Sequence, residues 1–109
     1  MAASEGTVRV VLVTAPSGEA EGLGRALVAE RLAACVNLVA GARSIYRWEG
    51  ELKLDDEVLL VIKTTEARLA ALTERVTALH SYALPEVLAL PTVGGSAAYL
   101  GWLAAEVRP

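Results

Sequence analysis

Two short runs of aliphatic and β-branched residues constrain the fold of this chain more than any other feature. Val8–Val13 has Arg9 as its one polar member, and Val58–Ile62 has none. Their length and their Val and Ile content predict β-strands, and the lack of polar alternation predicts strands that are buried on both faces. The remaining elements therefore decide whether one chain can bury them.

The other elements follow from periodicity and from turn residues. Glu49-Gly50, between two strand-like segments, is typical of a hairpin turn, because Gly adopts positive φ at little cost. An apolar stripe at helical spacing from Leu69 to Leu79 predicts a helix that ends at His80. The remaining predicted elements are a helix from an N-cap at Ser17 to about Ala33, strand segments Cys35–Val39 and Ser44–Trp48 with a bend or bulge at Gly41, a return strand from Glu51, an edge strand Val87–Leu90, and a last helix capped by Ser96.

The expected order is β-α-β-β-α-β followed by a C-terminal helix, in a single domain over residues 1–109. Two βα units joined by a hairpin predict an α+β fold, the ferredoxin-like split β-α-β sandwich, with an antiparallel sheet and both main helices on one face. One such domain has too few helices to cover the second face of the sheet. We therefore expect that face to be buried against other copies of the chain.

The scarcity of reactive side chains excludes several classes of site. The chain has one Cys, one His and two Asp, whereas a zinc site made of Cys and His needs three or four ligands. A disulfide within one chain is excluded, and Cys35 is expected to be a small, buried and inert residue. The net charge of −3 gives no basic surface for nucleic acid. We expect neither catalysis nor a required cofactor.

The chain also lacks the sequence signals of membrane insertion and export. Its longest stretch without charged residues falls short of an apolar helix that spans a bilayer. Residues Met1–Gly6 have neither a basic region nor an apolar stretch, so they do not resemble a signal peptide. We expect a cytoplasmic protein with no membrane partner.

Six short segments carry a resemblance to a known family: Thr14–Pro16, Arg31–Asn37, Ser44–Glu51, Ile62–Thr64, His80–Tyr82 with Pro85–Glu86, and Tyr99–Trp102. Together they resemble the CutA family of divalent-cation tolerance proteins. They extend over nearly the whole chain in order and spacing, and the combined set is what makes the resemblance specific. The resemblance implies the ferredoxin-like fold and a homotrimer similar in architecture to the PII signalling proteins.

The resemblance also implies where a metal ion would bind. In copper-binding members the ligands resemble a Cys on the first strand and a His pair at the end of the second helix; these positions hold Val13, Leu79 and His80 here. As a ligand, His80 needs a partner such as Glu86 or a residue of another subunit, and two ligands imply weak binding of Cu(II) or another divalent cation. The alternative is a helix-terminal His whose ring bonds a carbonyl or a carboxylate.

A second candidate site gathers aromatic and charged residues around the hairpin. Tyr46 and Trp48 alternate on one strand and therefore share a face. Two interpretations stay open for them: packing against a neighbouring subunit, or the wall of a cleft for a small ligand. The residues assigned to this cleft or interface are Tyr46, Trp48, Glu51, Lys63, Tyr82 and Trp102, with Glu86 beside them.

The function expected from these features is a role in divalent metal ion tolerance, performed by a cytoplasmic homotrimer. The alternative is a PII-like sensor that binds a small metabolite or nucleotide in clefts between subunits. The feature that separates the two is whether one cleft at a subunit boundary gathers His80, Tyr82, Glu86 and Lys63.

Overall fold

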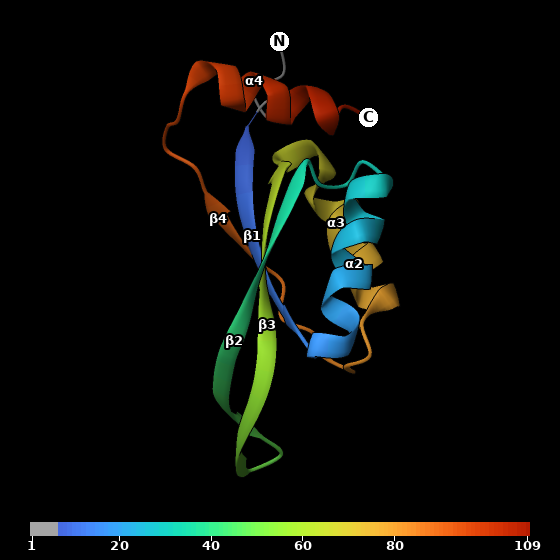
Figure 1. The fold of residues 1–109 in the computed structure, drawn as a ribbon, viewed down its shortest axis with the longest axis vertical. Coiled ribbons are helices and arrows are strands. Elements are labelled where there is room, and N and C mark those ends of the chain that lie inside the picture. Colours follow the sequence, from blue (N-terminus) through green and yellow to red (C-terminus); the bar gives the residue numbers. More distant parts are fainter. Residues whose placement is uncertain (1–6) are drawn as a thin grey trace.

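The computed structural model describes residues 7–109, and its elements have the predicted order. Residues 1–6, for which no signal peptide is predicted, lie outside the described part. The strands pair antiparallel in one sheet of order β2-β3-β1-β4, and α2 and α3 lie on one of its faces (Figure 1). This confirms the α+β ferredoxin-like fold. The strands are β1 (Val8–Ala15), β2 (Cys35–Trp48), β3 (Glu51–Thr65) and β4 (Leu88–Pro91), and the helices are α2 (Ser17–Ala29), α3 (Glu66–Leu79) and α4 (Ala97–Glu106).

The main core lies between helices α2 and α3 and one face of the sheet. Strands β1 and β3 pair with Val13 opposite Leu60, and alternate side chains of both strands point toward the helices. Removal of these side chains from water is the main stabilising contribution to the fold. The fully buried members of this core include Val11, Val13, Leu27, Leu60, Ile62, Leu72 and Val76.

The other face of the sheet is apolar and incompletely covered. Leu12 of β1 lies opposite Val61 of β3, and both are half-buried. Strand β4 continues this face with Leu88 and Leu90, which are 56% and 43% exposed. Within residues 7–109 the aliphatic side chains of the two apolar runs that face helices α2 and α3 are therefore buried, whereas on the other face Val8 alone is buried, in a small core with helix α4. We call the second surface the open sheet face; it comprises Val10, Leu12, Leu59, Val61, Leu88 and Leu90.

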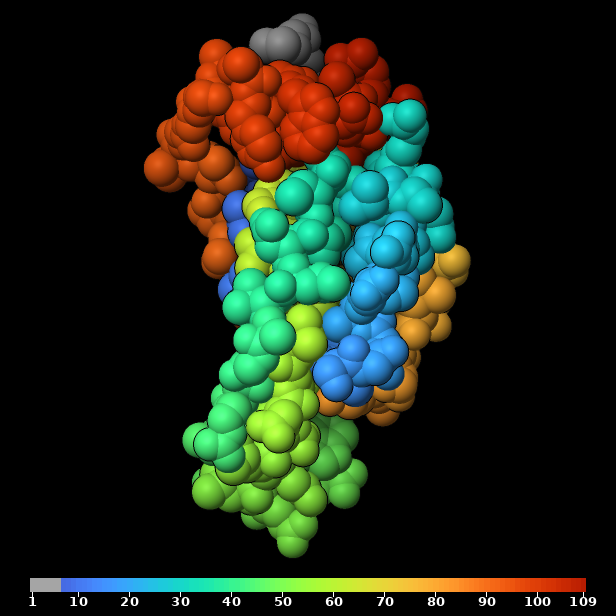
Figure 2. Space-filling model, viewed as in Figure 1, coloured from blue at the N-terminus to red at the C-terminus, as the bar shows by residue number. Residues whose placement is uncertain are grey.

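Strands β2 and β3 extend past the helices as a long hairpin, which projects at the bottom of Figures 1 and 2. The predicted turn is confirmed: Glu49 and Gly50 join the strands, and their φ angles are 50° and 81°. Gly41, the predicted bend, has a φ of 84° and lies where the register of β2 against β3 shifts. The segment is thus one continuous strand that carries a bulge.

Two element boundaries differ from the prediction by one residue. Pro16, rather than Ser17, is the N-cap of helix α2, and no side chain caps that end. Proline suits the start of a helix because its fixed φ and missing N–H cost nothing there. The edge strand is Leu88–Pro91 rather than Val87–Leu90, and Pro91 ends it at the border of the sheet.

The prediction was wrong at the C-terminus of helix α2, which ends at Ala29 and not near Ala33. Arg31 takes a positive φ of 58°, and the N–H of Leu32 donates to the carbonyl of Leu27 over 2.9 Å. This is the Schellman motif, in which a residue of left-handed conformation ends the helix. Leu27 and Leu32 are both buried in the core, so burial of the two side chains accompanies the turn.

Helix α4 closes one end of the sheet, at the top of Figure 2. Its predicted cap is confirmed, because the Ser96 hydroxyl accepts a hydrogen bond of 3.1 Å from the Tyr99 N–H. Leu103 and Val107 are fully buried in a small second core. Trp102 lies on the exposed side of the helix.

Candidate functional site

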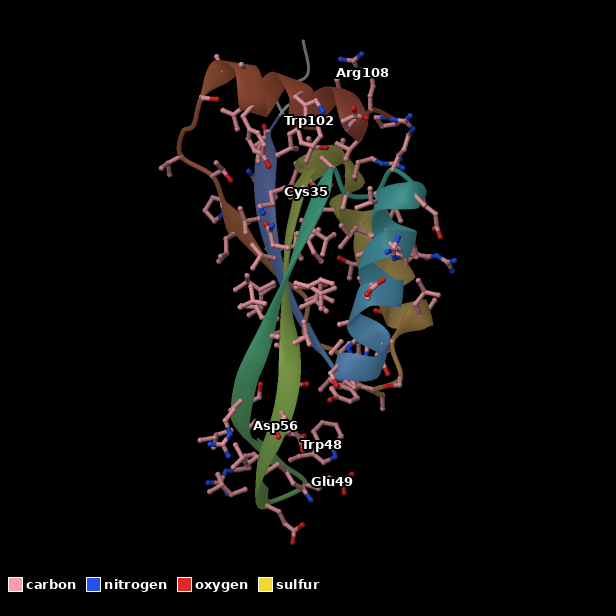
Figure 3. The ribbon with its side chains drawn as sticks, viewed as in Figure 1. Cys35, Trp48, Glu49, Asp56, Trp102 and Arg108 are labelled. Atoms are coloured by element: carbon pink, nitrogen blue, oxygen red, sulfur yellow. The ribbon has the colours of Figure 1, made fainter. Side chains whose placement is uncertain are left out.

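An open cleft of about 740 Å³ lies between the hairpin and the loop that follows helix α3. Trp48 belongs to its wall, and Figure 3 shows this residue on the projecting hairpin, far from Cys35 and Trp102 at the other end of the molecule. We call this feature the hairpin cleft. It is lined by Thr14, by residues 44–48 and Glu57 of the hairpin strands, and by residues 82–86 of the loop.

Two tyrosine hydroxyls bind carboxylates of β3 at the hairpin cleft. The Tyr46 hydroxyl donates to Asp55, and the Tyr82 hydroxyl donates to Oε2 of Glu57 over 2.9 Å. The hydrogen bond to Asp55 raises the pKa of Tyr46, while burial and the hydrogen bond to Glu57 raise the pKa of Tyr82. Both phenols are therefore neutral donors near pH 7.

The carboxylates of the cleft carry negative charge that few groups offset. Glu57 is 6% exposed, and none of the ion pairs within residues 7–109 includes it. Glu86 lines the same cleft, and burial together with the charge of Glu57 raises the pKa of Glu86. Arg47 also lines the cleft but pairs with neither carboxylate. A buried carboxylate without an ion-pair partner is costly, so the cleft favours a positively charged group.

His80 ends helix α3 as predicted, and its imidazole is fully enclosed. Its Nε2 lies 2.8 Å from the carbonyl oxygen of Thr14, and its Nδ1 accepts a hydrogen bond of 3.1 Å from the Tyr82 N–H. Because Nδ1 accepts, the neutral ring carries its proton on Nε2 and donates it to Thr14. Both ring nitrogens thus have partners within the chain. This geometry matches the alternative interpretation of His80 as a helix-terminal residue whose ring bonds a carbonyl.

Glu19 of helix α2 approaches the same loop. Its Oε1 accepts a hydrogen bond of 3.1 Å from the Ser81 N–H and lies 3.7 Å from Nδ1 of His80. Burial acts to raise the pKa of Glu19, but the hydrogen bonds from Ser81 and the electrostatic interaction with His80 together lower it below its ordinary value. The carboxylate therefore ties the start of α2 to the end of α3.

The structure brings together four of the residues assigned to the candidate sites. Tyr46, Trp48, Tyr82 and Glu86 all line the hairpin cleft. His80 adjoins it through the ring of Tyr82, whose centroid lies 4.6 Å from that of the imidazole. The cleft thus combines aromatic and acidic side chains with aliphatic residues and Arg47.

Lys63 lies elsewhere, near the start of β2. Its Nζ donates to the side-chain oxygen of Asn37 and lies 3.9 Å from Sγ of Cys35. Cys35 is half-exposed beside this ammonium, so the prediction of a buried residue was wrong. The reason is its position at the start of an edge strand, where β2 has one neighbouring strand instead of two.

Glu51 and Trp102 also lie away from the hairpin cleft. Glu51 is at the tip of the hairpin, with its Oε2 3.4 Å from Nζ of Lys53. Trp102 packs on Tyr99 of helix α4, with 5.6 Å between the ring centroids. Neither residue lines the cleft.

Two acidic partners of the cleft tyrosines were not predicted from the sequence: Glu57, which lines the cleft, and Asp55, which binds Tyr46 without lining it. Asp55 and Glu57 are two residues apart on β3, so both point to one face. The turn at Glu49-Gly50 also fixes the register that sets Ser44 opposite Asp55. The alternation of these two acidic residues, just before the apolar part of the strand, is the sequence signal that could have identified them.

Two of the three positions that the resemblance assigns to metal ligands, Val13 and Leu79, carry side chains without a ligating atom. Val13 is fully buried in the core, and Leu79 is an exposed apolar residue. In the described part of the chain, no three His, Cys, Asp or Glu residues are grouped so that they could hold a metal ion. None of the described helices is long and apolar enough to cross a membrane.

Comparison with known proteins finds one family over nearly the whole length. The model of the CutA1 divalent ion tolerance protein family matches residues 9–106. The divalent-cation tolerance protein CutA of Thermus thermophilus is 56% identical over 95 residues, which cover 86% of this chain and 92% of that protein. The chloroplastic protein CutA of Arabidopsis thaliana is 52% identical over 100 residues, or 91% of this chain and 55% of that protein. A solved structure of the PII-like protein CutA from Nostoc has a TM-score of 0.86 at 32% identity, covering 91% of this chain and 96% of that one.

Proposed function

Because the chain belongs to the CutA1 divalent ion tolerance protein family, we propose that it acts in divalent-cation tolerance as a homotrimer without catalytic activity. The family match over residues 9–106 is the observation that carries the proposal. The absence of catalysis is supported by His80, whose two ring nitrogens are both engaged with the backbone. A cytoplasmic location is part of the proposal and is tested by cell fractionation, since the Arabidopsis relative is named as chloroplastic.

The open sheet face supports the homotrimer. Its exposed leucines on β4 continue the half-buried apolar residues of β1 and β3, so water meets a connected apolar surface. Surfaces of this kind are typically covered by other subunits. The resemblance to PII signalling proteins sets the proposed number of copies at three.

Light scattering tests this assembly. We expect a mass of three times the 11.4 kDa of one chain. Leu88→Glu places a charge on the open sheet face and should yield smaller species, because the charge would have to be buried at the interface. Val93→Glu, at a fully exposed loop residue, is the matched control and should remain trimeric. A monomeric wild-type protein would contradict the proposal.

His80 and Glu86 remain the proposed ligands for weak binding of Cu(II) or another divalent cation. A cation on Nδ1 of His80 must displace the Tyr82 N–H, which weakens the site. Calorimetric titration with Cu(II) should give weaker binding for His80→Ala and for Glu86→Gln than for the wild type. Equal affinity in all three proteins would rule these ligands out.

Growth measurements test the role in tolerance itself. A host that lacks its own gene of this family is grown with raised Cu(II), Zn(II) or Co(II). We expect the wild-type chain to restore growth and the assembly-deficient Leu88→Glu variant to restore less of it, with Val93→Glu as the control. Equal growth with and without the wild-type chain would refute a part in tolerance.

The hairpin cleft favours a second candidate function, a PII-like sensor of a small molecule. The cleft joins aromatic walls to a buried carboxylate, an arrangement typical of ligand pockets. A screen of nucleotides against divalent cations, on protein of known mass, separates the two functions. Nucleotide binding without cation binding would favour the sensor.

A further inference from the structure

The walls of the hairpin cleft combine aromatic rings with carboxylates. Tyr46, Trp48 and Tyr82 line it together with Glu57 and Glu86. The faces of aromatic rings attract cations through their quadrupoles, and this attraction strengthens where water is excluded. Carboxylates add a full opposite charge. The chemistry of the walls is thus complementary to a cation that also has an apolar surface.

Glu57 is the carboxylate of the cleft that a bound cation would stabilise most directly. It is 6% exposed, yet its side chain accepts a hydrogen bond of 2.9 Å from the neutral hydroxyl of Tyr82 and belongs to no ion pair within residues 7–109. A second carboxylate, Glu86, lines the same space. Arg47 also lines the cleft, but it forms no ion pair with either carboxylate. A bound cation would offset this charge at the place where it is most desolvated.

The geometry favours an organic cation over a metal ion. Mg²⁺ or Ca²⁺ requires about six or more oxygen ligands, whereas no group of three acidic, His or Cys residues suited to a metal lies in residues 7–109. The hydroxyls of Tyr46 and Tyr82 already donate to carboxylates. A substituted ammonium needs no coordinating oxygens, because ring faces and a nearby carboxylate suffice.

We propose that the hairpin cleft binds a small organic cation with a quaternary or tertiary ammonium head. The aromatic rings of Tyr46, Trp48 and Tyr82 would surround its apolar surface, and Glu57 would supply the countercharge. The proposal rests on the second candidate function and names the class of ligand for it. The volume of about 740 Å³ leaves room for a head group and a short chain.

The test compares choline with 3,3-dimethylbutan-1-ol, its uncharged isostere. Trp102→Phe removes the second indole, so that fluorescence reports on Trp48 at the cleft. In this background we expect choline to change the emission in a saturable way, and the isostere to bind at least about tenfold more weakly. Calorimetry on the unsubstituted protein gives the same comparison without a probe.

Variants of the carboxylates assign the binding to the cleft. Glu57→Gln keeps the size of the side chain and an oxygen for the Tyr82 hydroxyl, and it should weaken choline binding by about tenfold or more. Asp56→Asn is the matched control, because this neighbour projects to the other face of β3 and pairs with Arg43. Far-UV circular dichroism checks that each variant folds, and Glu86→Gln serves if Glu57→Gln does not.

Each outcome decides the proposal. Equal binding of choline and its isostere would overturn the ammonium ligand while leaving a small-molecule cleft. Binding of ATP or ADP without choline would also overturn it and leave the sensor standing. Absence of binding by all of these probes would contradict both the proposal and the sensor. Equal loss in Glu57→Gln and Asp56→Asn would overturn the assignment to Glu57.

Discussion

The Tyr82 hydroxyl donates a hydrogen bond of 2.9 Å to Oε2 of Glu57, and this contact joins the loop after helix α3 to strand β3. Glu57 is buried, so the phenol replaces water as the partner of the carboxylate. The backbone N–H of Tyr82 also bonds Nδ1 of His80, and the two rings pack together. Tyr82 therefore links the end of α3 to the wall of the hairpin cleft.

Tyr82→Phe should destabilise the protein by about 1–3 kcal/mol, because it leaves a buried carboxylate oxygen without its donor. Urea unfolding at a fixed protein concentration measures the change in unfolding free energy. The double variant with Glu57→Gln should lose less than the sum of the two single variants, since the charge that needs the hydroxyl is gone. Strictly additive losses would contradict this coupling.

Glu19→Gln should reduce stability in a way that depends on pH. The folded-state pKa of Glu19 lies below its ordinary value of 4.5, so its stabilising contribution is fully present above that value and is lost as pH falls through the lowered pKa. Thermal unfolding from about pH 7 down to about pH 3 should show a difference of about 1 kcal/mol that vanishes at the acid end. Glu74→Gln, on the exposed side of α3, is the control; an identical pH profile for the two variants would count against the contact.

Glu49→Asn should stabilise the hairpin. Glu49 adopts a φ of 50°, which costs a residue with a Cβ about 1 kcal/mol and which Asn tolerates better. We expect a gain of about 0.5 kcal/mol, seen as a higher melting temperature. Glu51→Asn makes the same change inside β3, where Asn is disfavoured, and should not stabilise. Stabilisation by both variants would indicate an effect of charge and not of the turn.

Two glycines of helix α2 should respond differently to alanine. A Cβ at Gly22 meets no atom within 4 Å, so Gly22→Ala should gain about 0.5–1 kcal/mol from helix propensity. A Cβ at Gly24 would lie 3.3 Å from Cγ1 of Val36, and crowding against β2 should remove most of that gain. Chemical denaturation of the two variants measures the difference in unfolding free energy. Equal gains would mean that β2 moves away from the added Cβ without a measurable loss of stability.

Features set by local signals were predicted well. The turn at Glu49-Gly50, the end of α3 at His80 and the cap at Ser96 each depend on a few adjacent residues, and each was confirmed. The C-terminus of α2 was not predicted, because Arg31 takes the left-handed conformation that sequence patterns assign to Gly or Asn. Burial of Leu27 and Leu32 in the core outweighs that local preference.

Which residues line the cleft depends on their distances along the strands, and the types of the residues do not reveal these distances. Lys63 and Glu57 both lie on β3, but six residues of extended chain separate them by about 20 Å. Lys63 therefore meets Cys35 at one end of the sheet, while Glu57 meets Tyr82 at the other. The prediction that Lys63 lies in one cleft with the aromatic residues depended only on the complementary chemistry of their side chains.

The bulge in β2 decides which side chains can meet at the hairpin cleft. Ahead of it, Asn37 lies opposite Val61, so odd-numbered residues of the two strands share a face. Beyond it, Ser44 lies opposite Asp55, because two residues of β2 oppose one of β3. A shift of one residue in the pairing register moves every following side chain to the opposite face of the sheet. The added residue in β2 therefore places Tyr46 and Trp48 on the same face as Asp55 and Glu57 of β3. Deleting Gly41 would leave the composition of the hairpin almost unchanged and put its aromatic and acidic residues on opposite sides.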